Sequence, residues 1–332
     1  MRAVVVREFG GIDNVSLGDV PKPQPKAGEV LLETRAVSVN FVDLVMMSGN
    51  YQFKPALPFI PGKLPAGVVA AVGDGVTAFK PGDHAIAMAE QGGFAEFVVM
   101  PAGQCVPLPA PLAFTDAAAM SLVYDTAYFA LRERARIAKG ESVLVLGATG
   151  GVGLAAIQLA KAMGAGQVLA AVASKDKTDI VREAGADGIV DLAAPDLHES
   201  VRAQVFALAG KGGVDIILDM LGGDMFDAAI RALAWRGRLV VIGFASGRIP
   251  SLKMNYLLVK NIEVSGMQIS DYRKRMPAEM QACFREIFAW HAAGKLKPLP
   301  TKVYPLTEFA AAMHEIKDRT QRGRVVLSIG GK

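Results

Sequence analysis

A glycine-rich stretch near the middle of the chain, Val143-Leu-Val-Leu-Gly147-Ala-Thr-Gly150-Gly151-Val152-Gly153, decides the fold. Four apolar residues precede the glycines, and apolar side chains recur at the helical period from Val152 to Met163. Glycines between a strand and a helix let the chain turn sharply and let backbone N–H groups approach a pyrophosphate at the start of the helix. A dinucleotide site is therefore predicted at Gly147, Gly150, Gly151, Val152 and Gly153.

From this stretch onward, apolar strand-like runs alternate with helix-length segments. The runs lie at Val143–Leu146, Val168–Val172, Gly188–Val190, Ile216–Leu218, Leu239–Ile242 and Ile262–Gly266. Because these runs are apolar on both faces, they predict a parallel sheet covered by helices on both sides. The predicted fold class is α/β, with a doubly wound Rossmann domain over residues 123–267.

The beginning and the end of the chain follow a different pattern. Short strand-like runs, separated by prolines and glycines, lie at Ala3–Val6, Val30–Glu33, Val68–Val72 and Ala95–Val99. They predict an irregular, turn-rich antiparallel region. Helical patterns near 278–293 and 307–317 precede a last strand at Arg324–Ile329. We therefore expect a first domain over residues 1–122 that the tail, 268–332, completes.

Length and composition limit the class of protein. The chain has 332 residues, of which 52% are hydrophobic and 20% charged, enough for two globular cores. Its net charge of +4 arises from 36 basic and 32 acidic residues without long like-charged blocks. Neither a nucleic acid nor a membrane surface is therefore expected as a partner, and a small molecule is.

The sequence also bears on the compartment. The first residues hold only a short apolar run closed by charges, unlike a signal peptide. The uncharged stretch from Ser142 to Ala160 is long enough to suggest a membrane span, but its central glycines favour a turn. Cys105 and Cys283 are the only cysteines, which suits a reducing compartment. We expect a cytoplasmic protein.

The end of the second predicted strand of the Rossmann domain distinguishes the two nicotinamide cofactors. An acidic residue there would bind the ribose 2′-hydroxyl of NAD, whereas this chain has Ser174-Lys-Asp-Lys177. Ser174 can donate a hydrogen bond to a 2′-phosphate, and Lys175 or Lys177 can neutralise it. The pattern favours NADPH (NADP+ when oxidised). The alternative is that the lysines are solvated residues at the start of a helix.

Several further segments recur in a known order. They are Val39–Asp43, Gly49–Tyr51, Pro58–Gly62, Gly67–Gly73, Phe79–Asp83, the glycine-rich stretch and Ala184–Asp187. Together they resemble the zinc-independent branch of the medium-chain dehydrogenase/reductases, the quinone oxidoreductase and zeta-crystallin-like proteins. The resemblance covers nearly the whole chain. It implies a GroES-like twisted β-barrel catalytic domain interrupted by the Rossmann domain, an active site in the cleft, and a homodimer paired near residues 262–267.

The residues in the places of zinc ligands do not suit a metal. Zinc alcohol dehydrogenases of the superfamily have a cysteine near the position of Asn40 and a His-Glu pair at the position of Lys63-Leu64, together with a four-cysteine lobe. Neither cysteine of this chain occupies those places, and its four histidines form no cluster with ligand spacing. No metal is expected.

Without a metal, a reductase can transfer a hydride from NADPH to a carbon conjugated to a carbonyl, and negative charge then collects on the carbonyl oxygen. Tyr51 resembles the tyrosine that donates a proton in related enoyl reductases, and its phenol is a hydrogen-bond donor at neutral pH. Asn40 can donate to the substrate oxygen or orient the nicotinamide ribose. The alternatives are that Tyr51 is a packed loop aromatic and that Asp43 only supports the loop.

The resemblance implies further cofactor contacts, at Thr126, Gly243, Phe244, Gly266, Met267 and Arg324. Thr126 could instead cap a helix, and Arg324 could be a surface charge. Leu64 stands where many relatives have a glutamate, and Leu192 where some have a tyrosine. Lys63 and Pro65 are also unusual there, and nothing in the sequence explains them.

The leading functional hypothesis is NADPH-dependent reduction of a quinone or another conjugated carbonyl acceptor. An enoyl-thioester, alkenal or acrylate double-bond reductase is the alternative, because these substrates present the same conjugated carbonyl. A catalytically silent NADPH-binding protein, of the kind that lens crystallins of this family exemplify, is an alternative of another class. The acceptor, the pathway and the choice between dimer and tetramer stay open at this point.

Overall fold

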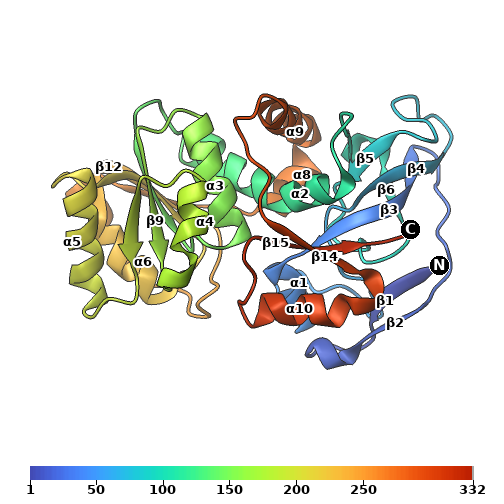
Figure 1. The fold of residues 1–332 in the computed structure, drawn as a ribbon, viewed down its shortest axis with the longest axis horizontal. Coiled ribbons are helices and arrows are strands. Elements are labelled where there is room, and N and C mark those ends of the chain that lie inside the picture. Colours follow the sequence, from blue (N-terminus) through green and yellow to red (C-terminus); the bar gives the residue numbers. More distant parts are fainter. Residues whose placement is uncertain (331–332) are drawn as a thin grey trace. The chain divides into compact units, whose positions relative to one another are not determined.

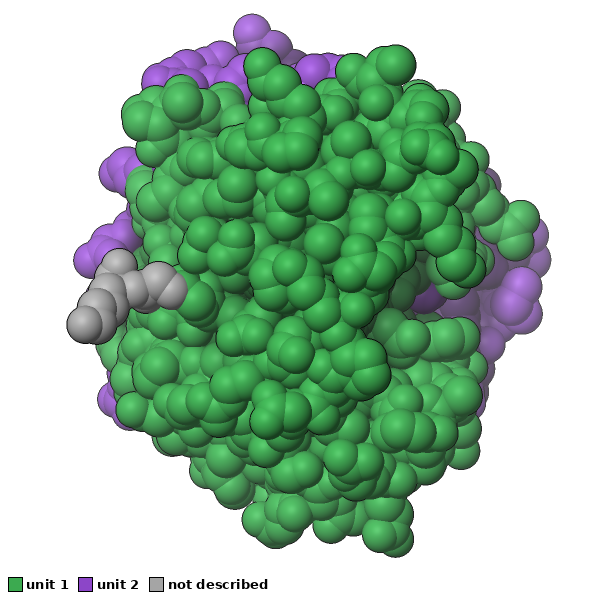
Figure 2. Space-filling view, turned by 90° about the vertical axis from the view of Figure 1, so that its right-hand side faces the viewer, with its two compact units in different colours: residues 1–122, 270–284, 298–332 green, residues 123–269, 285–297 purple. Residues whose placement is uncertain are grey.

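The computed structural model describes residues 1–330, which form two compact units (Figures 1 and 2). Unit 1 consists of Met1–Leu122, Ser270–Phe284 and the described residues from Pro298 onward. Unit 2 consists of Val123–Ile269 and Arg285–Lys297. Each unit is built around its own principal sheet, so each positions its functional residues separately.

Unit 2 is built on a six-stranded parallel sheet with the order β10-β9-β8-β11-β12-β13. The strands are β8 (Ser142–Leu146), β9 (Gln167–Val172), β10 (Gly188–Asp191), β11 (Val214–Asp219), β12 (Leu233–Val241) and β13 (Glu263–Gly266). Counted along the chain, this is the strand order of a doubly wound Rossmann sheet. The predicted α/β fold class is confirmed.

Helices cover this sheet because its strands are apolar on both faces. All residues from Val143 to Leu146 are fully buried. Helix α3 (Gly151–Ala162) packs on β8 and β9, while Val201 and Val205 of α5 (Leu197–Ala209) join the core beneath Leu144. This unit also contains α4 (Thr178–Glu183) and α6 (Gly223–Ala229), both labelled in Figure 1, and α7 (Asn255–Lys260).

Unit 1 holds a seven-stranded, mostly antiparallel sheet with the order β14-β15-β3-β4-β5-β7, in which β6 also pairs with β3. A separate hairpin pairs β1 (Arg2–Val6) with β2 (Val15–Asp19). The strands of the larger sheet are β3 (Glu29–Val39), β4 (Ala66–Val72), β5 (His84–Ala87), β6 (Phe97–Pro101), β7 (Cys105–Pro107), β14 (Thr301–Pro305) and β15 (Arg324–Ser328).

The two ends of the sequence meet in this sheet. β15 runs antiparallel to β3, with Val325 opposite Val39, so the last strand lies beside the end of β3. Helix α1 (Phe41–Met47) begins directly after β3, and α10 (Phe309–Lys317) packs against α1 and β15. The other helices are α2 (Phe114–Phe129), α8 (Ile269–Arg275) and α9 (Pro277–Ala292).

The structure places one segment differently from the sequence prediction. Residues 285–297 were expected to complete the first domain but belong to unit 2. The reason is a buried amide on α3: Gln158 Nε2 donates to the carbonyl of Lys297 at 3.2 Å, and Gln158 Oε1 accepts from the N–H of Lys297 at 2.8 Å. Because a buried amide needs such partners, this pair fixes the segment beside α3.

Among residues 1–330, no helix is long and apolar enough to cross a membrane. The uncharged stretch from Ser142 to Ala160 is divided between β8, the glycine loop and α3.

Candidate active site

The glycine loop joins β8 to α3 and leaves no room for side chains. Gly147 has a φ of +74°, which favours glycine, and Gly150 caps α3. A Cβ atom on Gly153 would lie 2.4 Å from the carbonyl oxygen of Gly147 and 2.6 Å from Cα of Ala148. The loop and the helix are therefore in contact through backbone alone, and the N–H groups at the start of α3 can face an anion.

The strand order places this loop at the switch point of the sheet. β8 and β11 are neighbours, and the chain proceeds from them toward opposite edges of the sheet. At such a point the connections diverge beyond the carboxyl ends of the strands and leave a crevice that binds ligands in this class of fold. The loop is thus suited to a dinucleotide.

Asp219 is the last residue of β11, the strand on the other side of the switch point. It is fully buried, and its Oδ1 accepts from the N–H groups of Leu221 at 2.8 Å and Gly222 at 2.9 Å. Burial raises the pKa of this carboxyl group, although these two bonds act in the opposite direction. Sequence reasoning missed Asp219. The available signal was an acidic residue at the end of the apolar run Ile216–Leu218, three residues before the glycine pair Gly222-Gly223.

The predicted 2′-phosphate residues follow β9. Ser174 caps a short 3₁₀ turn, Lys175–Lys177, and its Oγ accepts from the N–H of Asp176 at 3.3 Å. Ser174, Lys175 and Asp176 are exposed, and Lys177 is half-buried. These side chains are therefore accessible at the carboxyl end of the strand that borders β8, where a ribose is expected.

The other predicted cofactor residues of unit 2 lie at the same ends of the neighbouring strands. Gly243 N–H donates to the carbonyl of Asp219 at 3.3 Å, and Met267 N–H donates to that of Val241 at 2.9 Å. Phe244 is 42% exposed. Gly266 ends β13. Together they continue the carboxyl edge of the sheet from β11 to β13.

Thr126 lies inside helix α2, where its side chain is buried. The alternative that it caps a helix is therefore wrong. Its Oγ1 donates to Oδ1 of Asp125 at 3.4 Å.

In unit 1, Asn40 lies between the end of β3 and the start of α1, and its side chain is buried. The Oδ1 atom accepts from Nη2 of Arg324 at 2.8 Å, and Nδ2 donates to the carbonyl of Ser38 at 3.1 Å. A guanidinium has only donors, so it determines which end of the amide is oxygen. The orientation of Asn40 is thus set by its neighbours.

Arg324 is the first residue of β15, and its side chain is buried and is not a surface charge. It is 5% exposed, and its Nε donates to the carbonyl of Ala119 at 3.0 Å. Every predicted cofactor residue except Arg324 lies in unit 2. Contact of Arg324 with the cofactor stays a prediction, and its observed hydrogen bonds are to Asn40 and Ala119.

Asp43 supports Asn40 from the first turn of α1. It is fully buried, and its Oδ2 accepts from the N–H of Asn40 at 2.8 Å. Burial raises the pKa of Asp43 to about 6, although hydrogen bonds from the backbone of Asn40 and Gly62 and the charge of Lys63 act in the opposite direction.

A second group of charges surrounds Glu90, in the loop after β5. Its Oε2 accepts from Lys63 Nζ at 2.5 Å and Ser270 Oγ at 2.6 Å, while Oε1 accepts from Arg273 Nη1 at 2.8 Å. Burial raises the pKa of Glu90, but the charges of Arg273 and Lys63 outweigh it and hold the pKa at about 2. Sequence reasoning missed this cluster, which we call the Glu90 cluster (Lys63, Glu90, Ser270 and Arg273).

Tyr51 follows α1 and packs, half-buried, against the core of unit 1. The Nζ atom of Lys63 lies 5.7 Å from the centre of its ring. The two predicted catalytic residues, Asn40 and Tyr51, are thus in the same unit, and the Glu90 cluster belongs to that unit as well.

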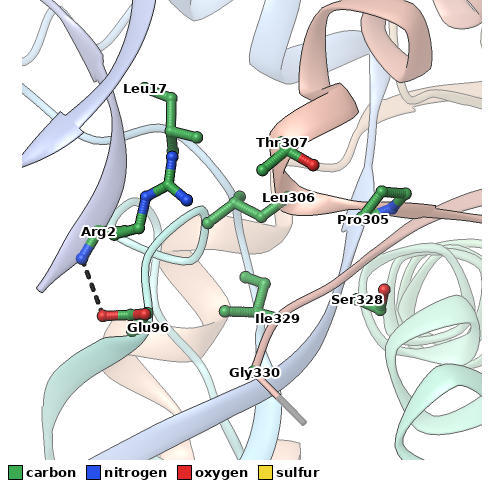
Figure 3. Close-up of a pocket in the computed structure, with 9 residues that line it drawn as sticks. All are labelled: Arg2, Leu17, Glu96, Pro305, Leu306, Thr307, Ser328, Ile329 and Gly330. Carbon is green, nitrogen blue, oxygen red and sulfur yellow. Dashed lines mark hydrogen bonds between the residues drawn. The ribbon is translucent and has the colours of Figure 1, made fainter. Parts of the chain in front are cut away.

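A pocket of about 230 Å³ also lies in unit 1 but contains none of the predicted site residues. Its lining includes Arg2, Glu96 and Ser328, and the N–H of Arg2 donates to Oε2 of Glu96 at 2.8 Å (Figure 3). Across the described residues 1–330, no three or more His, Cys, Asp or Glu side chains are grouped so that they could hold a metal ion.

Family models match both parts of the chain. The alcohol dehydrogenase GroES-like domain matches residues 26–110, and the zinc-binding dehydrogenase domain matches residues 151–285. Quinone oxidoreductase from Rattus norvegicus is 36% identical over 331 residues, covering 98% of this chain and 97% of that protein. The chain belongs to the quinone oxidoreductase family. The family predicted from the sequence is confirmed.

Solved structures of related proteins have the same fold. Quinone oxidoreductase from Escherichia coli, solved as a complex with NADPH, is 28% identical, with a TM-score of 0.90 over 99% of this chain and 100% of that one. The CurK enoyl reductase is also 28% identical, with a TM-score of 0.87 over 99% of each chain. Structural similarity thus extends to both a quinone reductase and an enoyl reductase.

Proposed function

We propose that this protein is an NADPH-dependent, zinc-independent reductase of small conjugated carbonyl compounds, with quinones as the leading class of acceptor. The proposal rests on the close packing of Gly153 against the backbone of Gly147 and Ala148. This packing forms a loop of bare backbone at the switch point of the unit 2 sheet. Such a loop suits a ligand that binds through backbone N–H groups. The NADPH complex of the Escherichia coli relative supports the choice of cofactor.

Different residues of unit 2 would bind different parts of the cofactor. The start of α3 would bind the pyrophosphate, and Ser174 with Lys177 the 2′-phosphate. The strand ends at Gly243, Phe244, Gly266 and Met267, with Thr126, would hold the nicotinamide. When bound, NADPH supplies a hydride to an electron-poor carbon of the acceptor.

The residues of unit 1 would act on the acceptor oxygen. The Asn40 amide would donate to the acceptor oxygen or orient the nicotinamide ribose, and its Nδ2 also donates to the Ser38 carbonyl. Because Arg324 and Ser38 fix the amide, this donor is already oriented before the acceptor binds. The phenol of Tyr51 would donate a proton or a hydrogen bond as negative charge develops.

The test is the steady-state oxidation of NADPH, with NADH in parallel, against benzoquinones, naphthoquinones, alkenals, acrylates and short enoyl thioesters. Turnover of quinones with a preference for NADPH supports the proposal. Selective turnover of an enoyl or acrylate compound moves the assignment to double-bond reduction, which the similarity to CurK enoyl reductase favours as the second candidate. NADPH binding without any turnover indicates a silent, crystallin-like protein.

We also propose that the protein is a homodimer. β13 is an edge strand of the unit 2 sheet, and Met254, Leu258 and Val259 beside it are 69%, 80% and 75% exposed. Exposed apolar groups beside an unpaired strand edge are typical of a subunit interface. Leu258→Asp combined with Val259→Asp should halve the mass measured by light scattering, and a monomeric wild-type protein would overturn the proposal.

The cytoplasm is the proposed location. Neither Cys105 nor Cys283 is in a disulfide and both are buried, and burial raises the pKa of the Cys105 thiol to about 12. Buried cysteines outside disulfides suit a reducing compartment.

A further inference from the structure

Lys63 has no part in the function described so far, yet the backbone around it is unusual. Gly62 has a φ of +94° and Leu64 a φ of +49°. A Cβ atom on Gly62 would lie 2.3 Å from Cδ1 of Phe94, so this position requires glycine. Leu64 is a fully buried non-glycine residue in the left-handed region, which costs about 1 kcal/mol or more. This strained turn directs Lys63 into the protein.

The ammonium group that this turn buries is held at several points. Lys63 is 2% exposed, and its Nζ donates to both the carboxylate and, at 3.0 Å, the carbonyl oxygen of Glu90. Glu90 is itself fixed by Arg273, which is 1% exposed, and by Ser270. A buried ammonium is tolerated only when it is paired in this way. The Glu90 cluster therefore determines where the charge of Lys63 lies.

Lys63 also acts on Tyr51 directly and on Asn40 through Asp43. Its Nζ lies 5.7 Å from the ring centre of Tyr51, within the distance of about 6 Å at which a cation attracts an aromatic face. Its charge also favours the ionised form of Asp43. Asp43 in turn accepts the N–H of Asn40.

We propose that Lys63 is a positioning residue of the reductase: the Glu90 cluster holds its buried ammonium group near the ring of Tyr51, and the ammonium group orients that side chain. The inference rests on the proposed function, because it assigns Lys63 to the same site.

The proposal has a pH signature. The groups that act on the carboxylate of Asp43 are Lys63, the N–H groups of Asn40 and Gly62, and the Asn40 side chain, which Arg324 holds. Glu90 forms ion pairs with both Lys63 and Arg273. Loss of the Lys63 charge should raise the pKa of Asp43 further above about 6. Activity that requires charged Asp43 would then fail at a higher pH.

The experiment compares the full-length wild type with Lys63→Met, Lys63→Arg, Tyr51→Phe and the Lys63→Met/Tyr51→Phe double variant. With the best acceptor, Lys63→Met should lower kcat about tenfold or more and leave the NADPH dissociation constant within about twofold. It should also move the acid limb of the kcat profile upward by about half a pH unit or more. Lys63→Arg should restore most of both, and Lys80→Met, at an exposed lysine of the same unit, should change neither.

The double variant separates positioning from a general effect on folding. If Lys63 acts through Tyr51, Lys63→Met in the Tyr51→Phe background should lower kcat by much less than tenfold, because the effects of interacting residues on kcat are not additive. Should Lys63→Met fail to fold by circular dichroism, Glu90→Gln replaces it, since it keeps a hydrogen-bond acceptor and loses the charge. The expected effect of Glu90→Gln is a reduction of kcat of about threefold or more, because Lys63 loses an anchor, whereas the acid limb should not move upward, because Lys63 keeps its charge.

The outcomes distinguish this inference from the proposed function. If the wild type turns over and Lys63→Met has the same kcat and pH profile, the role of Lys63 is overturned and the proposed function stands. The same holds if the effects of Lys63→Met and Tyr51→Phe on kcat are fully additive. No turnover by the wild type overturns the function, and the positioning role with it. Titration of the ¹³C-labelled Asp43 carboxyl group, which needs no activity, still decides whether Lys63 sets its charge: an unchanged midpoint in Lys63→Met contradicts it.

Discussion

The glycine loop of unit 2 and the Glu90 cluster of unit 1 are two opposite ways of building a binding site. The loop occupies seven consecutive residues, carries no charge, and depends on the absence of side chains at Gly147 and Gly153. The cluster consists of side chains from separate segments, with Glu90 and Arg273 183 residues apart, and depends on their charges. A backbone site fails when an atom is added, whereas a side-chain site fails when a charge is removed.

The largest effect is expected from adding one methyl group to the loop. In Gly153→Ala the new Cβ would meet the carbonyl of Gly147 at 2.4 Å, so the loop must move away from the helix start. NADPH affinity, measured by fluorescence titration, should fall about 100-fold or more. Gly212→Ala is the matched control, because a Cβ there meets nothing within 4 Å. Tight NADPH binding by Gly153→Ala would show that the loop does not depend on bare backbone.

Removing one hydroxyl from unit 1 should affect the reaction and spare the cofactor. Tyr51→Phe should lower kcat on the best acceptor about 100-fold, in the range of a lost general acid, with an unchanged NADPH dissociation constant. Tyr304→Phe, which removes a phenol that donates to Glu315, should leave kcat unchanged. Equal turnover by Tyr51→Phe and wild type would exclude Tyr51 as the proton donor and leave it a packed aromatic.

A change of charge beside the loop should alter which cofactor is used. Ser174→Asp places a carboxylate where a 2′-phosphate is expected, so the ratio of kcat/KM for NADPH over NADH should fall about tenfold or more. Lys211→Gln, at an exposed lysine elsewhere in unit 2, should leave the ratio unchanged. An unchanged ratio in Ser174→Asp would mean that the turn after β9 does not recognise the phosphate.

The smallest effect is expected in the pH dependence of the free energy of unfolding, through Asp43 and Glu90 of unit 1. The folded pKa of Asp43, about 6, lies above its ordinary value of 3.8, so its contribution to stability is full below pH 3.8 and is lost as pH rises through 6. Glu90 behaves in the opposite way, with stability present above pH 4.5 and lost as pH falls through about 2. Lowering the pH from 8 to 5 should therefore titrate Asp43 and leave Glu90 charged.

Asp43→Asn isolates this contribution. Between pH 8 and pH 5 the wild type should gain about 1 kcal/mol from Asp43, or roughly 2–4 °C in Tm, that Asp43→Asn lacks. Other groups titrate alike in both proteins and cancel in the difference. Asp74→Asn, at an exposed position, should follow the wild type. Identical pH dependence in Asp43→Asn would show that burial does not perturb Asp43.

The same contrast explains what could be predicted from the sequence. The sheet of unit 2 and its glycine loop are local patterns, in which the period of the side chains and the absence of Cβ atoms are visible in consecutive residues. Asn40 and Arg324 were also recognised, each from its own segment, but their hydrogen bond was not, because nothing local connects residues 284 apart.

Partners of buried charges and the packing of the tail were not visible in the sequence. Lys63 looked unusual beside Leu64 and Pro65, but its partner Glu90 lies 27 residues away and Arg273 far beyond. The helical pattern near residues 278–293 indicated a helix and could not indicate which sheet its second half would pack on. Gln158, an amide on an otherwise apolar face of α3, was the only local sign of that contact.

The pairing of β15 with β3 sets the order in which a growing chain can complete its sites. By the time residue 269 has been synthesised, all strands of the unit 2 sheet and the glycine loop exist. Asn40 is made early in synthesis, but the guanidinium that orients its amide is added only 284 residues later, at Arg324. A ribosome-bound chain that stops before β15 can therefore present a finished nucleotide cradle while its acceptor site is still unassembled.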